Sequence, residues 1–223
     1  MRDSVLSNKE EYLNALFSNE KESETKKLSR QYSEEVGRAR ISVSPPESAL
    51  ISLLVKMHGC KKFVEIGTLT GLSAQYIFES LPEGAELWTL EKEPAHGDKA
   101  AQVFAKIDQS KKKIHLVMGD AREELEKLSA QGPFDGVFID GNKAAYMDYL
   151  VWAEKNLRKG GLILADNIFL SGSVWNDPSE QAQRFSDKQV RILREFNERL
   201  ADSELYQSAI APTQEGLFIA IKK

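Results

Sequence analysis

The stretch Lys61-Lys62-Phe63-Val64-Glu65-Ile66-Gly67-Thr68-Leu69-Thr70-Gly71-Leu72-Ser73-Ala74 decides the fold of this 223-residue chain. Its apolar run 63–66 predicts a buried β-strand, and the apolar periodicity of residues 72–78 predicts a helix. A parallel strand that turns into a helix through glycines leaves backbone N–H groups at the carboxyl edge of a sheet, where doubly wound α/β proteins bind small cofactors. The spacing is Glu-x-Gly-x-x-x-Gly, which differs from the Gly-x-Gly-x-x-Gly of dinucleotide sites.

The remainder of the chain repeats the same strand–helix alternation. After the fifth strand, two further runs joined by residues 212–216 predict an antiparallel hairpin. The sequence therefore predicts an α/β fold, a single doubly wound, mostly parallel seven-stranded sheet with a C-terminal antiparallel hairpin. We expect residues 159–161, Lys-Gly-Gly, to end the helix that precedes the fifth strand. The predicted strands are 63–66, 86–90, 114–118, 134–139, 162–165, 204–210 and 217–221, and the helices after the first strand are 72–80, 94–107, 122–128, 146–157 and 187–200.

Residues before this alternation predict a helical extension, so we divide the chain into 1–40 and a main domain, 41–223. Four apolar residues at helical spacing predict an amphipathic helix, followed by a solvated Glu/Lys segment. This helix could cap the fold, form a lid or contact another subunit. Ser44-Pro45-Pro46-Glu47 predicts the start of the next helix. The four apolar residues are Tyr12, Leu13, Leu16 and Phe17.

Composition limits the classes of partner. The formal net charge is −4, so no overall basic field favours nucleic acid or an anionic membrane. No apolar run approaches the ~18 residues of a membrane span, and Met1-Arg2-Asp3-Ser4 lacks the apolar core of a signal peptide. The single cysteine, Cys60, cannot form an intrachain disulfide. We expect a cytoplasmic protein that binds neither nucleic acid nor membrane.

Acidic residues follow all five predicted parallel strands. The carboxyl ends of parallel strands share one edge, and unpaired buried carboxylates are costly, so five together predict a binding site rather than five helix caps. Glu91, 24 residues after Gly67, can accept hydrogen bonds from both hydroxyls of a ribose. Because the third glycine that admits a pyrophosphate is missing, S-adenosylmethionine fits this edge better than a dinucleotide. Asp120 could bind the adenine amino group or cap its helix. The positions at the strand ends are Glu65 with Gly67, Glu91, Asp120, Asp140, and Asp166 with Asn167.

Four motifs together resemble the cation-dependent O-methyltransferases of the catechol and caffeoyl-coenzyme A type. They are 64–71, 119–121, 134–143 and 166–167, and the resemblance covers roughly residues 40–223. It implies the class I S-adenosylmethionine methyltransferase fold and a homodimer. It also implies that Asp140, Asp166 and Asn167 hold a divalent cation, and that Lys143 with Asp140 is catalytic. The implied S-adenosylmethionine site consists of Val43, Glu65, Gly67, Ser73, Glu91, Asp120, Ala121 and Asp140. Relatives often have Asp-Ala-Asp-Lys where this chain has Asp140-Gly141-Asn142-Lys143, which leaves the role of Asn142 open.

The implied ligand chemistry agrees with these residue types. Two carboxylates and an amide oxygen suit Mg²⁺, with Mn²⁺ or Ca²⁺ as alternatives, better than zinc. Adjacent hydroxyls of a small acceptor could chelate such a cation, and Lys143 could take or orient the hydroxyl proton. We therefore expect transfer of a methyl group from S-adenosylmethionine to a small catechol-like or caffeoyl-like acceptor with vicinal hydroxyls.

Three alternatives remain at the level of sequence. A nicotinamide-dependent oxidoreductase is disfavoured by the glycine spacing, and a methyltransferase acting on RNA or protein is disfavoured by the net charge. A binding protein without turnover would not need Lys143 beside Asp140. We expect the loop 169–184, with Trp175, to set the choice of acceptor, whose identity and methylated position the sequence does not define.

Overall fold

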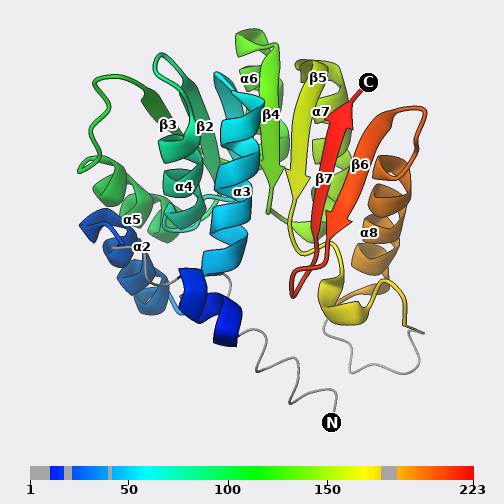
Figure 1. The fold of residues 1–223 in the computed structure, drawn as a ribbon, viewed down its shortest axis with the longest axis horizontal. Helices are drawn as coiled ribbons and strands as arrows, with labels where there is room; N and C mark the ends of the chain where they lie inside the picture. The colour runs from blue at the N-terminus through cyan, green and yellow to red at the C-terminus, as the bar shows by residue number, and fades with distance from the viewer. Residues whose placement is uncertain (1–10, 18–21, 40–41, 177–184) are drawn as a thin grey trace.

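The computed structural model describes residues 11–17, 22–39, 42–176 and 185–223, and its centre is a seven-stranded sheet (Figure 1). The strand order is β3-β2-β1-β4-β5-β7-β6. The first five strands are parallel, and β7 runs antiparallel to both β5 and β6. The predicted fold class is therefore confirmed. The strands are β1 (Lys62–Ile66), β2 (Glu86–Glu91), β3 (Lys113–Met118), β4 (Phe134–Ile139), β5 (Leu157–Ala165), β6 (Tyr206–Ala211) and β7 (Leu217–Lys222).

Helices cover both faces of the sheet and enclose two apolar cores. On one face, α3 (Pro45–His58), α4 (Leu72–Ser80) and α5 (Pro94–Phe104) pack over Phe63 and Phe138. The other face carries α6 (Ala121–Leu128), α7 (Tyr146–Asn156) and α8 (Asp187–Leu200). Such a buried parallel sheet explains why its strands are continuous apolar runs. Short 3₁₀ segments in the described ranges include η2 (Ser129–Gln131), η3 (Lys143–Ala145) and η4 (Leu170–Gly172).

The register brings the five parallel strands to the same level at their carboxyl ends. Ile66 of β1 pairs with Leu90 of β2 and with Ile139 of β4, and Ile139 pairs with Ala165 of β5. The residues that come next in each strand therefore lie side by side along the lower edge of the sheet in Figure 1. The strand order changes direction between β1 and β4, the point where ligands bind in such sheets.

The expected helix stop at residues 159–161 is wrong. Helix α7 ends at Asn156, and its cap residue Leu157 is already extended and starts β5. Phe134 pairs with Leu157 but Gly136 pairs with Leu162, so residues 158–161 form an irregularity in the strand. Gly160, with φ 74°, accommodates this bulge instead of capping the helix.

The N-terminal part differs from the prediction in one respect. Residues 11–17 are helical, as expected from their apolar spacing. The following charged segment is not solvated along its length, because it forms α2 (Glu24–Glu35) and buries Lys26, Ser29 and Ser33 against α4 and α5. In the described part of the chain, no helix has both the length and the apolarity that a membrane crossing requires.

Candidate active site

The turn after β1 requires glycine at both of its ends. Gly67 has φ 105°, and a β-carbon there would collide with the carbonyl oxygen of Asp140. Gly71 has φ 83° and begins α4, where a β-carbon would lie 2.6 Å from the ring of Phe104. The backbone of the turn can therefore approach the end of β4 closely. This contact joins the two halves of the sheet at the point where the strand order reverses.

Glu65 presents a fully buried carboxyl group beneath this turn. Its Oε2 accepts a hydrogen bond from the Thr89 hydroxyl at 2.5 Å, whereas Oε1 is buried and has no hydrogen-bond partner among the described residues. Burial raises the pKa of Glu65 to about 8, against the opposing effect of the Ser73 and Thr89 hydroxyls. A buried acceptor without a donor is costly, and a cationic amino group would satisfy it. This residue fits the methionine part of S-adenosylmethionine.

Glu91 ties the ends of β1 and β2 together. Its Oε2 accepts from the backbone N–H of Leu69 at 2.7 Å, and its Oε1 accepts from Lys92 N and Glu93 N at 2.8 Å each. The side chain is only 8% exposed, and it is fixed in place by three backbone donors. Each carboxylate oxygen can accept more than one hydrogen bond, so capacity remains for the ribose hydroxyls predicted from the sequence.

Asp120 caps α6. Its Oδ1 accepts from Arg122 N at 3.0 Å, and the Arg122 guanidinium holds both carboxylate oxygens at 3.0 and 3.1 Å. This pairing lowers the pKa of Asp120 to about 2. Of the two roles expected for Asp120, helix capping is present. Ala121 begins α6, and Val43, 5% exposed, directly precedes the cap of α3.

The sheet brings Asp140 and Lys143 into direct contact beyond β4. Lys143 Nζ donates to Asp140 Oδ1 at 2.9 Å and to the hydroxyl of Tyr146 at 2.6 Å. The short segment η3 turns the chain so that these three residues face one another. Both charged side chains are mostly buried but remain accessible, at 15% and 20% exposure for Lys143 and Asp140.

Tyr146 extends this contact to β5, and sequence analysis did not identify it as a site residue. Its hydroxyl donates to the carbonyl oxygen of Asp166 at 2.9 Å and lies 3.4 Å from that of Ile139. Burial, with the charges of Asp140 and Asp166, raises the pKa of Tyr146 well above its ordinary value, so it stays a neutral donor. Its position three residues after Lys143, on the same side of a helical turn, is the signal that could have identified it.

The predicted cation ligands lie at the neighbouring ends of β4 and β5. Burial and the charge of Asp140 raise the pKa of Asp166 well above its ordinary value. Asp166 Oδ1 accepts from Asn167 N at 2.7 Å, and Asn167 has the left-handed φ of 57° that asparagine tolerates. Two buried carboxylates that repel each other are a suitable environment for a hard divalent cation. No group of three His, Cys, Asp or Glu side chains forms a metal site within the described ranges, so the fit rests on two carboxylates and one amide.

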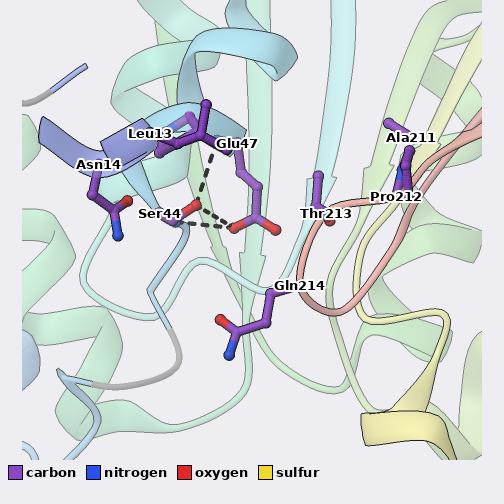
Figure 2. A pocket seen from close by; sticks show the side chains of 9 residues that line it. Leu13, Asn14, Ser44, Glu47, Ala211, Pro212, Thr213 and Gln214 are labelled. Atoms are coloured by element: carbon purple, nitrogen blue, oxygen red, sulfur yellow. Dashed lines mark hydrogen bonds between the residues drawn. The ribbon is translucent and has the colours of Figure 1, made fainter. Parts of the chain in front are cut away.

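A pocket of about 200 Å³ has Glu47 among its lining residues (Figure 2). Its walls come from the helical stretch 11–17, the start of α3 and the loop 212–216 between β6 and β7. The Glu47 carboxylate points into the space between Ser44 and Gln214 in Figure 2. Sequence analysis identified Glu47 only as a helix-start residue, because nothing in the local pattern shows that a distant hairpin faces it.

The loop expected to choose the acceptor is described only as far as Asn176, and residues 177–184 lie outside the described part of the chain. Trp175 is 63% exposed, and its ring packs edge-on against Phe169 with centroids 5.1 Å apart. It is available to a ligand, although the pocket of Figure 2 is lined by other residues.

The strand order and the glycine turn define a class of protein, the class I S-adenosylmethionine-dependent methyltransferases. Comparison with known proteins narrows this class. The family model described as O-methyltransferase matches residues 16–223, and the chain belongs to that family. It is an S-adenosylmethionine-dependent O-methyltransferase, and the oxidoreductase alternative is wrong.

Individual relatives agree with this assignment. The chain is 33% identical over 198 residues to a catechol O-methyltransferase of Niastella koreensis, covering 85% of this chain and 86% of the relative. The crystal structure of TomG, an O-methyltransferase of Streptomyces achromogenes in complex with S-adenosylmethionine, has a TM-score of 0.82 at 29% identity and covers 95% and 96% of the two chains. An O-methyltransferase of Bacillus cereus in complex with S-adenosylhomocysteine has a TM-score of 0.83 at 25% identity and covers 96% and 100%.

Proposed function

We propose that this enzyme transfers the methyl group of S-adenosylmethionine to a hydroxyl of a small catechol-like or caffeoyl-like acceptor, with the help of a divalent cation. The observation that carries the proposal is the chain of contacts Asp140–Lys143–Tyr146–Asp166 at the carboxyl edge of the sheet. The catechol O-methyltransferase name of the Niastella koreensis relative supports the acceptor class.

In this proposal, Asp140, Asp166 and Asn167 would hold the cation, and Mg²⁺ suits their oxygen atoms best. The two hydroxyls of the acceptor would chelate the cation, which would lower the pKa of the one that reacts. Glu65, Gly67, Ser73 and Glu91 would hold the methyl donor along the edge from β1 to β2, with Val43, Asp120 and Ala121 at its margins.

Lys143 would orient the reacting hydroxyl or take its proton. As an ammonium group it has three donors, of which Asp140 and Tyr146 occupy two, and the third would point at the acceptor oxygen and orient it. As the neutral amine, Nζ would take the hydroxyl proton on its lone pair and become that ammonium group. Tyr146, fixed by the Asp166 carbonyl, keeps Nζ from swinging away. The donor sulfonium leaves as a neutral thioether, so positioning supplies much of the rate.

A panel of catechols assayed with and without EDTA tests this function. We expect methyl transfer that chelation abolishes and that Mg²⁺ or Mn²⁺ restores. Asp166→Ala should lose cation binding and keep its affinity for S-adenosylmethionine, whereas Glu91→Ala should do the reverse. Asp148→Ala, an exposed carboxylate on α7, is the control that should change neither.

Activity that persists after thorough chelation would disprove the role of the cation. Methyl transfer to RNA or protein substrates, with none to the catechol panel, would favour the macromolecular alternative. We further propose a homodimer and a cytoplasmic location, both expected from the sequence.

A further inference from the structure

The segment 167–176, which follows β5, contains several residues in a backbone conformation that their side chains disfavour. Asn167, Leu170 and Ser171 have φ angles of 57°, 46° and 51°. Asparagine tolerates this left-handed region, whereas leucine and serine adopt it at a cost in free energy. Such a conformation persists only where the surrounding structure holds it. The segment therefore depends on contacts from other parts of the chain.

The loop between β6 and β7 supplies such contacts, mainly through Glu215. Its Oε2 accepts from Ser171 N at 2.8 Å, and its Oε1 accepts from Ser171 Oγ at 2.9 Å. Its backbone O accepts from Phe169 N at 3.0 Å, and Gly216 O accepts from Ile168 N at 3.4 Å. At Gly216, with φ 76°, a β-carbon would lie 2.7 Å from the ring of Phe169. One carboxylate therefore holds both the N–H and the hydroxyl of Ser171, where the two backbones approach closely.

Helix α8 holds the same segment through Arg194 and Asn197. Arg194 Nε donates to Val174 O at 2.9 Å, and its Nη2 donates to Asn176 O at 3.2 Å. Asn197 Nδ2 donates to Ile168 O at 3.1 Å. Two elements that are distant from the segment in the sequence therefore fix its backbone.

The segment begins at the proposed cation site. Asn167 is a proposed ligand of the cation, and Leu170 N donates to Asn167 O at 3.4 Å. Ser171, which Glu215 holds, is the next residue after Leu170. A shift of Ser171 would therefore move Asn167, and with it an acceptor that chelates the cation. Misplacing reacting groups by about 1 Å can lower a rate about a hundredfold.

We propose that Glu215 is a positioning residue for methyl transfer, because its carboxylate fixes Ser171 and, through the backbone, Asn167 and the acceptor. The reach of the side chain matters in this role and its charge does not. Glutamine can accept from Ser171 N through Oε1 and donate to Ser171 Oγ through Nε2. Aspartate keeps the charge, but its carboxylate falls about 1.5 Å short. The inference rests on the proposed function, since it concerns the acceptor of that same site.

The test measures the two mono-O-methyl isomers formed from 4-methylcatechol, whose hydroxyls are not equivalent. In Glu215→Ala and Glu215→Asp we expect the isomer ratio to move about threefold towards one and KM for the acceptor to rise about fivefold, because a loosened segment admits the acceptor in both orientations. Glu215→Gln should keep the wild-type ratio and KM.

Hydrogen exchange of the unliganded enzymes, followed by mass spectrometry, tests the contact without turnover. Exchange in residues 167–176 should be faster in Glu215→Ala and Glu215→Asp than in the wild type, and unchanged in Glu215→Gln. Glu204→Ala, an exposed carboxylate that precedes β6, is the matched control and should change neither the exchange nor the isomer ratio.

Faster exchange with an unchanged isomer ratio and KM would overturn the inference, since Glu215 would then only stabilise the fold. A ratio that changes in Glu215→Gln but not in Glu215→Asp would overturn it as well, because charge and not reach would be responsible. A wild-type ratio near one would mean that the acceptor is not held in one orientation, with the same consequence. In these three cases the proposed function stands, whereas a wild-type enzyme that does not methylate the catechol contradicts both. If Glu215→Ala fails to fold, Glu215→Asp decides the matter.

Discussion

At the scale of single residues, Glu65 is a proposed binding residue whose burial lowers the stability of the protein without ligand. Its folded-state pKa of about 8 lies above the ordinary value of 4.5, mainly because of burial. A carboxyl whose pKa is raised on folding contributes stability fully below pH 4.5 and loses it as the pH rises through 8. The unliganded protein therefore becomes less stable across this range because of Glu65.

We predict that Glu65→Gln is more stable than the wild type at pH 9, by a few kcal/mol, and nearly equal to it at pH 5. Denaturant unfolding of the unliganded proteins at pH 5, 7 and 9 measures the difference. The same variant should bind S-adenosylmethionine more weakly, since a neutral amide replaces the proposed partner of its amino group. Glu83→Gln, on the surface, serves as control and should show no such pH-dependent gain. A stability difference that does not vary with pH would contradict the buried, protonated state of Glu65.

The positions of single residues at the sheet edge were predictable where the backbone alone determines them. Glu91 ends a parallel strand and Asp140 and Asp166 each follow one, so the register of the sheet brings them to one edge whatever their side chains do. Tyr146 and Glu47 depend instead on where a helix start points and which distant loop faces it. The spacing of residues along the chain does not contain that information. A period of 2 in a strand or 3.6 in a helix shows only which face of that same element a residue lies on.

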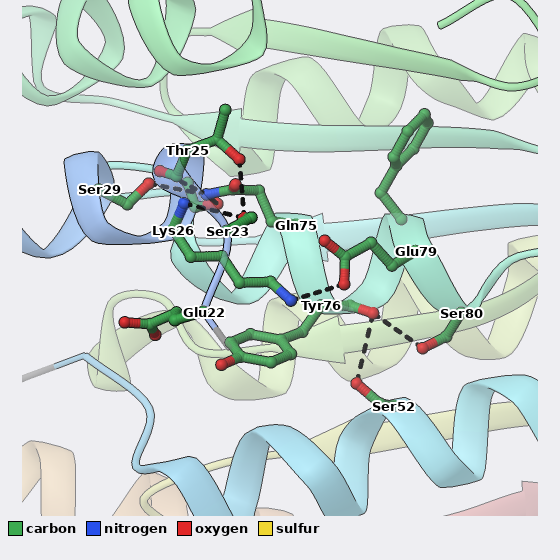
Figure 3. Close-up of polar contacts among 12 residues, drawn as sticks. Glu22, Ser23, Thr25, Lys26, Ser29, Ser52, Gln75, Tyr76, Glu79 and Ser80 are labelled. Carbon is green, nitrogen blue, oxygen red and sulfur yellow. Dashed lines mark hydrogen bonds and ion pairs between the residues drawn. The ribbon is translucent and has the colours of Figure 1, made fainter. Parts of the chain in front are cut away.

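At the scale of elements, helix α2 is bonded to the glycine turn 67–71 through a buried network of hydrogen bonds. Ser29 Oγ donates to Thr70 O at 2.8 Å, and Thr70 Oγ1 donates to Ser29 O at 2.8 Å. Gln75 Nε2 of α4 donates to Ser29 Oγ at 2.8 Å, as Figure 3 shows beside the Lys26–Glu79 ion pair. Thr70 lies between Gly67 and Gly71, so α2 is bonded directly to the turn at the proposed cofactor edge.

We predict that Ser29→Ala weakens both the fold and the binding of S-adenosylmethionine. Removing this hydroxyl takes away one hydrogen-bond partner of the buried Thr70 carbonyl and one of the Gln75 amide. We expect this loss to lower the free energy of unfolding by about 1–3 kcal/mol. The looser turn should raise the Kd of S-adenosylmethionine severalfold in titration calorimetry. Lys27→Ala, on the exposed side of α2, should leave both quantities unchanged. Loss of stability with unchanged affinity would mean that α2 only covers the core.

Elements with a clear period were predictable, and those with mixed signals were not. The bounds 72–80 for α4, 134–139 for β4 and 187–200 for α8 agree with the prediction because caps, glycines and apolar spacing point to the same ends. Gly160 could equally cap a helix or relieve a strand, and only the pairing of β5 with β4 decides between them. The sequence of α2 predicts a solvated segment, because the residues that the helix buries are serines and a lysine and not apolar side chains.

At the scale of the whole molecule, the helices cover the sheet unevenly. None of the described helices stands in front of β7 and β6 on the side that faces the viewer in Figure 1. On β7 that side carries the half-buried Ile219 and Ile221, and the neighbouring helix α3 exposes 54% of Leu53 and 75% of Met57. An apolar surface next to the edge strand β6 is a typical position for a subunit contact.

We therefore predict a homodimer in which α3 takes part. Light scattering coupled to size exclusion should give twice the chain mass of 25.0 kDa, about 50 kDa. The exposed pair Leu53→Glu with Met57→Glu should dissociate it to single chains without unfolding them, because charges replace apolar contacts between subunits and neither side chain is in the core. Val151→Glu, on α7 across the sheet, introduces the same charge at a residue 40% exposed and should stay dimeric. A wild-type mass near that of one chain at micromolar concentration would disprove the dimer, and a dimer that survives the double substitution would move the contact away from α3.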